Sequence, residues 1–273
     1  MKKGRSGGYA VPTNYENVNF TDTNVTYSDP KDIPGTPTKR INVEYSHEGS
    51  RKNLLLQIPR GIVVFGLSEF PRENPTKFNI DINIDTPEMK KFRGKLEILD
   101  NLFRDKIEQS KNVWGKGKDL VYNPMIRVDG EWPARLRLKL PVIKPESEPK
   151  DSTVRIPTFD VFDGSEAGKA PSKVTICDQG QINWDWVNRG MEITPVIKFE
   201  GIYIVNKEVY PVWRVDRIRI DKQPFFNNPF LDVDGSGEYA ELTPENPWST
   251  KDVCTQTQSN DEESEPESEE EDF

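Results

Sequence analysis

Apolar and polar residues alternate most regularly at residues 78–85, FNIDINID. Successive side chains of a strand point to opposite faces, so this pattern predicts a strand with one buried and one polar face. Two longer apolar runs precede it, at residues 53–59 and 61–70. Their composition predicts two more strands, separated by a Pro-Arg-Gly break and buried on both faces for part of their length.

Residues 86–111 follow a different period, with apolar side chains at steps of three and four residues. This period predicts one amphipathic helix that packs its apolar stripe on the core. The stripe consists of Met89, Phe92, Leu96, Leu99, Phe103 and Ile107. Thr86 suits the N-cap position and Pro87 the first helical position, so we expect the helix to begin there.

Strand patterns return after the helix. Residues 120–129 and 134–143 predict a hairpin around the turn sequence DGEWP. Further strands are expected at residues 153–162, 192–199, 201–206 and 209–220. Many short strands with one interposed helix predict a mainly β fold, an OB-fold-like small barrel with long loops, where OB stands for oligonucleotide-binding. A β-sandwich with one stray helix is the alternative.

The two ends of the chain lack such periods. Residues 1–38 are rich in Gly, Pro, Asn and Thr and predict a mobile or loosely draped N-terminal arm. We expect an OB-fold-like nucleic-acid-binding domain over residues 39–231, a linker over 232–260 and a disordered acidic tail over 261–273.

The charge of the chain is concentrated in that tail. The chain has 46 acidic and 37 basic side chains, and nine of the acidic ones lie in residues 261–273. The remaining 37 acidic side chains (46 less 9) equal the basic ones, so the tail carries the whole net charge of −9. Such a run stays solvated. Phe273 beside it suits a pocket of a partner protein.

The residue inventory excludes several classes of function. His47 is the only histidine and Cys177 and Cys254 are the only cysteines, so neither a zinc site of four N/S ligands nor a disulfide framework is expected. We therefore predict no metal, no cofactor and no enzymatic activity. The chain has no apolar run of 18 residues and no apolar segment near its start, so neither a membrane span nor a secretory signal is expected, and the protein should be intracellular.

One basic row accompanies the predicted hairpin. In RLRLKL, residues 135–140, the leucines alternate with cations. If the leucines point to the core, Arg135, Arg137 and Lys139 stand on the outer face about 7 Å apart. This spacing suits phosphates along a single strand, and Trp132 directly precedes the row. A solvated outer face with no ligand is the alternative.

A second row is predicted in residues 212–220, VWRVDRIRI. Simple alternation places Trp213, Val215, Arg217 and Arg219 on one face. An aromatic beside cations is the pairing that single-strand binding without sequence preference requires. The remaining candidates are Tyr203, Phe65 and Phe70 for stacking, with the core as the alternative for each, and Lys52, Arg60, Arg93 and Lys95 as an extension of the positive track.

The strand-rich body with one helix and an acidic tail ending in Asp-Phe resembles a known group of proteins. It is similar to the replicative single-stranded DNA-binding proteins of short-tailed bacteriophages, and more so to related proteins of large nucleocytoplasmic DNA viruses. The body segments that carry the resemblance are residues 54–70, 132–141 and 193–220.

The resemblance implies an OB-fold protein that coats single-stranded DNA in replication, recombination and repair, in a host nucleus or at a cytoplasmic viral replication site. It also implies that the tail recruits a polymerase, helicase or primase and occupies the basic groove when DNA is absent. The tail residues implied in recruitment are Glu269, Glu270, Glu271, Asp272 and Phe273.

Two other classes of function remain open from the residues. An acidic-tailed histone chaperone, or another protein-binding β-domain, would use the tail to attract basic proteins. A structural virion protein would leave Phe273 unexplained. The sequence also leaves the oligomeric state open, with a homodimer among the alternatives, and a preference for DNA over RNA rests on the resemblance alone.

Overall fold

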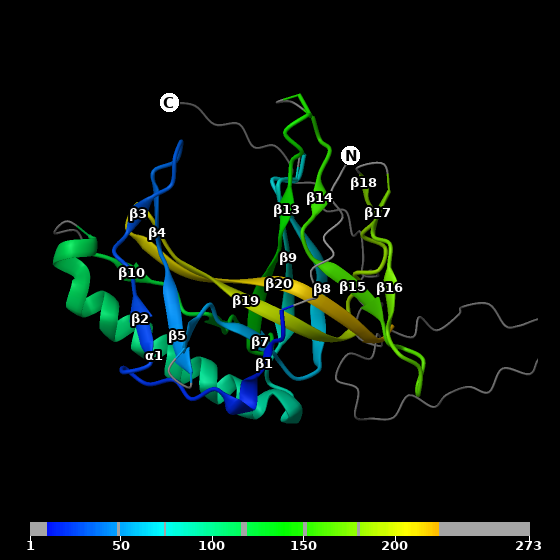
Figure 1. Ribbon diagram of the computed structural model, residues 1–273, viewed down its shortest axis with the longest axis horizontal. Coiled ribbons are helices and arrows are strands. Elements are labelled where there is room, and N and C mark those ends of the chain that lie inside the picture. The colour runs from blue at the N-terminus through cyan, green and yellow to red at the C-terminus, as the bar shows by residue number, and fades with distance from the viewer. Residues whose placement is uncertain are drawn as a thin grey trace, which may run out of the picture. The chain divides into compact units, whose positions relative to one another are not determined.

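The computed structural model describes residues 10–47, 50–73, 75–115, 119–149, 152–178 and 181–223 (Figure 1). All of them belong to one compact unit, Met1–Phe225. The predicted linker at 232–260 and tail at 261–273 lie outside the described residues.

The described residues form one long helix, α1 (Lys90–Trp114), two 3-10 turns and twenty strands. The turns and the strands before the helix are η1 (Tyr15–Asn17), η2 (Pro87–Met89), β1 (Thr13–Asn14), β2 (Val25–Tyr27), β3 (Lys31–Asp32), β4 (Thr38–Ile41), β5 (Val43–His47), β6 (Ser50–Lys52), β7 (Leu55–Gln57), β8 (Gly61–Phe70) and β9 (Lys77–Asn83). The strands after the helix are β10 (Val121–Tyr122), β11 (Ile126–Arg127), β12 (Arg135–Leu140), β13 (Val142–Ile143), β14 (Ile156–Pro157), β15 (Asp160–Asp163), β16 (Ser172–Val174), β17 (Cys177–Asp178), β18 (Gln181–Ile182), β19 (Glu192–Val205) and β20 (Glu208–Lys222).

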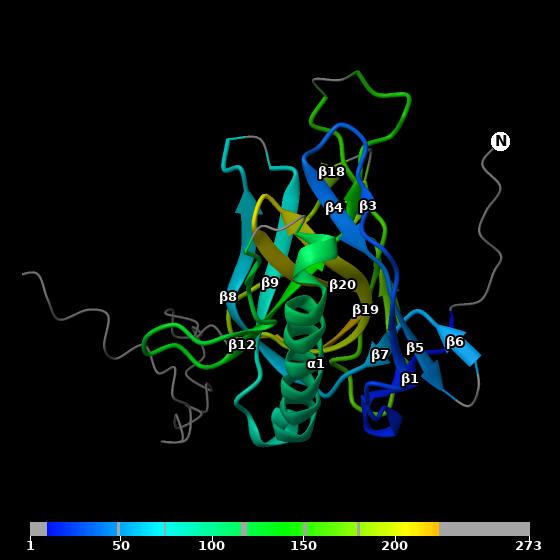
Figure 2. The same ribbon diagram turned by 90° about the vertical axis from the view of Figure 1, so that its left-hand side faces the viewer.

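Five of these strands close into a barrel. The hydrogen-bonded ring runs β8, β9, β12, β20, β19 and back to β8. Counted along the chain this order is 1-2-3-5-4, with β12 and β20 parallel and the other neighbours antiparallel. This closed order is that of an OB fold, so the predicted mainly β, OB-fold-like barrel is confirmed. In Figure 2, β8, β9, β12, β19 and β20 surround a common centre behind α1.

The barrel core follows from the alternation of β9 and β12. Their register places Ile80 opposite Leu138 and Ile82 opposite Leu136, and all four side chains are buried. The polar residues between them therefore point outward. The strand pattern read from the sequence holds in both strands.

Helix α1 lies between β9 and β12 in the chain and covers one end of the barrel core. Its apolar stripe is buried as predicted, and the Phe103 ring lies 5.3 Å from the ring of Phe199 on β19. Pro87 opens the turn η2 directly before the helix, while the Thr86 side chain makes no capping hydrogen bond. The helix continues to Trp114, beyond the predicted end at residue 111.

Strands β19 and β20 form one long hairpin interrupted by three register shifts. The two strands predicted at 192–199 and 201–206 are therefore one strand that passes through Gly201. Gly201 has a φ of 143°, and a Cβ atom there would lie 2.8 Å from the Ile41 carbonyl oxygen. Only glycine fits this close approach of β4 to β19.

Packing begins earlier in the chain than the predicted boundary at residue 38. Val18, Phe20 and Val25 are buried in the core, and β1 pairs with β7. These three apolar residues are spaced too irregularly to produce a helix or strand period, which explains why the segment was expected to be a mobile arm. Residues 1–9 of that expected arm lie outside the described residues.

Trp213 on β20 lies inside the barrel and only 2% of its surface is exposed. Replacing it with alanine should lower the free energy of unfolding by about 3–5 kcal/mol, because a large cavity replaces the indole. Trp132→Ala is the matched control, since that side chain is 43% exposed, and it should cost less than about 1 kcal/mol. Urea unfolding measures both values. Equal losses for the two variants would contradict this placement of Trp213.

Candidate nucleic-acid interface

The outer face of β9 and β12 carries the densest group of candidate residues. These are the second and third strands of the barrel, and OB folds bind oligonucleotides on that face. Along β12 the leucines point inward, so Arg135, Arg137 and Lys139 lie on the outer side as predicted. They differ in exposure, because Arg135 is buried while the other two are partly exposed.

Arg137 is held by a buried carboxylate on the neighbouring strand. Its Nε and Nη2 atoms donate to Oδ1 and Oδ2 of Asp81 at 2.9 and 2.8 Å. Asp81 is only 3% exposed. These hydrogen bonds raise the pKa of the Arg137 guanidinium above its usual value. The bidentate pair fixes the direction of the guanidinium and leaves its outer edge to solvent.

Arg135 lies deeper on the same face, with 8% of its side chain exposed. Its guanidinium lies 5.4 Å from the centre of the Phe65 ring and forms an ion pair with Asp129. Its Nε is 3.9 Å from Oδ2 of Asp81, too far for a hydrogen bond. Within the described part of the chain, Nε and Nη1 of Arg135 have no hydrogen-bond partner. Unpaired buried donors are uncommon in folded proteins, and these two have almost no surface through which a ligand could reach them.

A third arginine completes the group. Arg127 on β11 is directly opposite Arg135 in the antiparallel pair of β11 and β12. Burial, and next the positive charge of Arg137, lower the pKa of Arg127 below its usual value. Three arginines thus share two aspartates, Asp81 and Asp129, which leaves one excess positive charge. Like charges that lie opposite each other destabilise a sheet, and a bound anion would relieve this repulsion.

Two exposed aromatic rings lie next to these arginines. Phe65 and Trp132 are 41% and 43% exposed, and their ring centres lie 4.8 Å apart at an interplanar angle of 76°. Phe65 lies at a register shift of β8, where Gly66 has a φ of 79°. The sequence left open whether Phe65 lies in the core. Its exposure shows that it is not a core residue. We call the group of Phe65, Trp132, Arg127, Arg135 and Arg137 the arginine–aromatic face.

Lys139 and Tyr203 lie beside that face on the same barrel. The Lys139 Nζ is 3.2 Å from Oε2 of Glu200 on β19. The Tyr203 ring lies 5.9 Å from the guanidinium of Arg40, and burial, followed by the charge of Glu200, raises the pKa of Tyr203 to about 12. Tyr203 is half-buried and presents a cation–π contact rather than an open ring.

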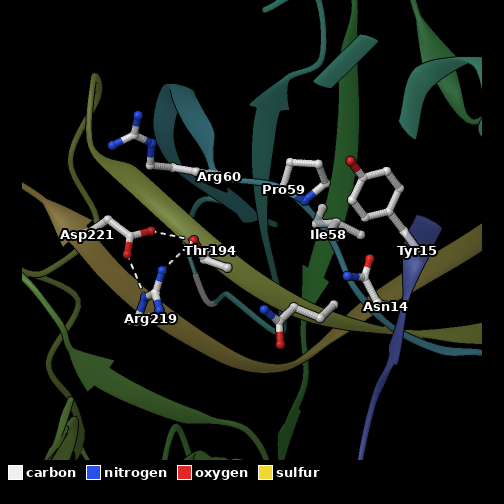
Figure 3. Close-up of a pocket in the computed structure, with 9 residues that line it drawn as sticks. Asn14, Tyr15, Ile58, Pro59, Arg60, Thr194, Arg219 and Asp221 are labelled. Atoms are coloured by element: carbon white, nitrogen blue, oxygen red, sulfur yellow. Dashed lines mark hydrogen bonds and ion pairs between the residues drawn. The ribbon is translucent and has the colours of Figure 1, made fainter. Parts of the chain in front are cut away.

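Arg60 and Arg219 line a separate hollow of about 390 Å³. Figure 3 shows both arginines at its wall together with Thr194 and Asp221. The Arg219 Nε is 2.6 Å from Oδ1 of Asp221, and Arg60 is paired with Glu192 at 3.0 Å. The other residues that line the hollow are Asn14, Tyr15, Gln57, Ile58 and Pro59. The hollow shares no residue with the arginine–aromatic face.

The predicted row on β20 is wrong. Val215 pairs with Ile197 and Arg217 pairs with Val196, so Asp216 forms a bulge between them. One extra residue reverses the alternation, which puts Trp213 and Val215 inside and leaves Arg217 and Arg219 outside. Trp213 therefore cannot stack on a base. Its indole nitrogen donates instead to the Met125 sulfur at 3.0 Å.

Two further candidates have structural partners. Arg93 on α1 is paired with Asp85 and with Glu97, and Lys95 donates to the backbone carbonyls of Glu16 and Val18. They hold the helix to its surroundings rather than form part of the arginine–aromatic face.

Other candidates cannot be placed or lie elsewhere. The Lys52 side chain lies outside the described residues, as do the tail residues 269–273. Phe70 is 61% exposed at the end of β8, where Lys77 lies 5.7 Å from its ring centre.

Sequence reasoning missed the acidic partners and Arg127. The polar side of the 78–85 pattern contained Asp81, and Arg127 lay in the first arm of the predicted hairpin. The strand pairing that brings Asp81 opposite Arg137 was the signal needed to connect them.

The described residues provide neither a cluster of metal ligands nor a membrane-spanning helix. They contain no group of three or more His, Cys, Asp and Glu side chains placed to hold a metal ion. They also contain no helix with the length and apolar character that a membrane crossing requires.

Comparison with known proteins gives few relatives. No protein-family model matches the chain. The chain is 23% identical over 99 residues to an uncharacterized protein, L291, of Acanthamoeba polyphaga mimivirus, a match that covers 33% of this chain and 17% of that protein. Among solved structures, gp2.5, a single-stranded DNA binding protein encoded by bacteriophage T7, aligns with 65% of this chain and 97% of its own at a TM-score of 0.39 and 8% identity. The fold assignment rests on the strand order of the barrel itself.

Asp81 should be required for the arginine–aromatic face to form. Asp81→Asn removes the charge that Arg137 and Arg135 share and should lower the free energy of unfolding by roughly 3 kcal/mol, because two partly or fully buried cations lose their counter-charge. Glu200→Gln is the matched control. It removes the partner of a more exposed lysine and should cost less than about 1 kcal/mol in the same chemical denaturation experiment. A wild-type midpoint for Asp81→Asn would contradict this role.

Proposed function

We propose that this protein binds single-stranded DNA with little sequence preference, on the arginine–aromatic face of its barrel. The observation that carries the proposal is a pair of exposed rings in contact, Phe65 and Trp132, of which Phe65 lies against Arg135 in a group of arginines with one positive charge in excess. In OB folds this face is the one that binds oligonucleotides.

Each part of the face suits one part of a nucleic-acid strand. The guanidinium of Arg137 is held by Asp81 and is partly exposed, so its outer edge can donate to a phosphate oxygen, while the buried Arg135 adds positive charge beneath the face. The exposed rings offer flat surfaces on which bases stack, at about 1–3 kcal/mol per base. Every base has such a surface, so stacking favours little sequence preference.

The same features favour single strands over duplexes. A base can stack on Trp132 or Phe65 only when it is not already stacked between its neighbours. A regular duplex would meet the arginines through its phosphates alone. The affinity for single strands should therefore be higher, and it should fall steeply as salt concentration rises.

The acidic segment at residues 261–273 supports a second part of the proposal. Its nine carboxylates form a polyanion, and its covalent attachment to the barrel would hold it near the basic face at roughly millimolar effective concentration. It would compete there with DNA phosphates. When DNA displaces it, its carboxylates and Phe273 become free to recruit a replication polymerase, helicase or primase. The protein would then coat single strands in viral replication, recombination and repair.

The two exposed rings should contribute measurably to affinity. Trp132→Ala and Phe65→Ala should each weaken binding of a fluorescein-labelled oligothymidylate by roughly 5- to 100-fold, as expected for the loss of one stacked base. Val113→Ala on α1 removes an exposed apolar side chain away from this face and should leave affinity unchanged. Fluorescence anisotropy measures all three. Wild-type affinity in both ring variants would contradict the proposed face.

Removal of residues 261–273 should tighten binding of single-stranded DNA, because the competing polyanion is gone. The effect should be largest at low salt, where polyanion competition is strongest. Recruitment of replication enzymes in a pull-down should be lost with the same residues. If the shortened chain bound DNA no more tightly than the full chain, the proposed competition would be contradicted. If the full chain bound histones but no oligonucleotide, the histone-chaperone alternative would replace this proposal.

A further inference from the structure

A second line of cations crosses the barrel at right angles to β12. Lys139 on β12 is directly opposite Arg214 on β20, and Arg214 is directly opposite Lys198 on β19. Neighbouring strands are about 4.8 Å apart, so the three residues lie within about 10 Å along the sheet. All three are partly exposed on the outer side of the barrel. We call Lys139, Arg214 and Lys198 the cross-strand ladder.

The ladder has fewer carboxylates than cations. Glu200 is 3.2 Å from Lys139. Among the described residues, neither Arg214 nor Lys198 forms an ion pair. Three like charges on directly opposite positions repel one another across the sheet. An anionic chain that lies across the strands would make the same arrangement favourable.

The ladder continues the arginine–aromatic face. Lys139 follows Arg137 by two residues on β12, a step of about 7 Å on the same side of the strand. From Lys139 the line of charge turns and crosses β20 and β19. The two groups together therefore trace a bent path of about 17 Å from Arg137 to Lys198.

We infer that the cross-strand ladder holds the phosphodiester backbone of the single strand where it leaves the arginine–aromatic face. This inference rests on the proposed function. Phosphates of one strand rise about 3.4 Å per nucleotide along the B-form axis, and the step is longer in an extended strand. Lysine and arginine side chains are long, so cations on strands about 4.8 Å apart can splay to reach successive phosphates. The bend at Lys139 suits a flexible single strand, whereas a duplex of this length is stiff.

A neighbouring ring favours a nucleic acid over an acidic peptide as the occupant. The positive charge of Arg214 acts on the Tyr203 hydroxyl, and Arg40 lies over the Tyr203 ring, so ring and ladder form one patch. The Arg40 guanidinium over that ring is flat and positively charged, and a base can stack on it at the end of the ladder. Aspartate and glutamate side chains can pair with a guanidinium but have no aromatic face to stack on it.

The test is a salt titration of the full-length double variant Lys198→Ala/Arg214→Ala with an oligothymidylate of about 16 nucleotides. Two lost phosphate contacts should reduce the slope of log affinity against log salt concentration by about 1.4 and weaken binding at least tenfold at low salt. Lys91→Ala/Lys169→Ala is the charge-matched control, because both lysines are exposed and lie outside β12, β19 and β20. It should leave slope and affinity unchanged.

The outcomes separate this inference from the proposed function. Removing repelling cations should not destabilise the barrel, and an unfolding midpoint equal to or above that of the wild type confirms that the variant is folded. A wild-type slope with tight binding would overturn the ladder and leave the arginine–aromatic face standing. Tighter binding in the double variant would also overturn it, since the ladder would then hold residues 261–273. If the wild type bound no oligonucleotide, the proposed function would fall and this inference with it.

Discussion

Closure of the barrel through β20 is the constraint on which the other features depend. β20 pairs with β19 along its length and with β12 in parallel at Leu138 and Lys139. Two strands of this length can curve round a small core only where extra residues bend them, and the register shifts of the β19–β20 hairpin provide these bends. Each shift also decides which side chains point outward. The bulge at Asp216 therefore puts the Trp213 indole in the core while Arg214 lies on the surface.

Burial of Asp81 determines how the arginines are held on the outer face of β9 and β12. A buried carboxylate is unfavourable unless it is paired, and here the bidentate contact with Arg137 and the nearby Arg135 provide the pairing. The arrangement orients two guanidiniums without neutralising the group, because Arg127 adds a third positive charge. A site of this kind needs little reorganisation when an anion arrives, since the side chains that would contact it are already fixed.

The elements were largely predictable from local patterns, whereas the site was not. Strand β8 follows from a local apolar run, and the inward face of β9 and the stripe of α1 follow from local periods; all three agree with the structure. The prediction of which β20 side chains share a face was wrong, because simple alternation does not reveal a bulge. The cross-strand neighbours of Lys139 and Arg137 are set by pairing between strands 50 to 80 residues apart, which a local pattern does not contain. Asp81 was missed for that reason, whereas Arg127 lies opposite Arg135 within the predicted hairpin and was overlooked there.

The distribution of ion pairs explains how a body with equal numbers of acidic and basic residues can favour a polyanion. Outside the acidic segment the charges balance, yet the carboxylates are not spread evenly. Asp85 and Glu97 neutralise Arg93 on α1, while Asp221 neutralises Arg219 at the separate hollow. The arginine–aromatic face and the cross-strand ladder have fewer acidic partners than cations. Exposed charges act over about 10 Å at moderate salt, so this local excess, and not the net charge, sets what the barrel attracts.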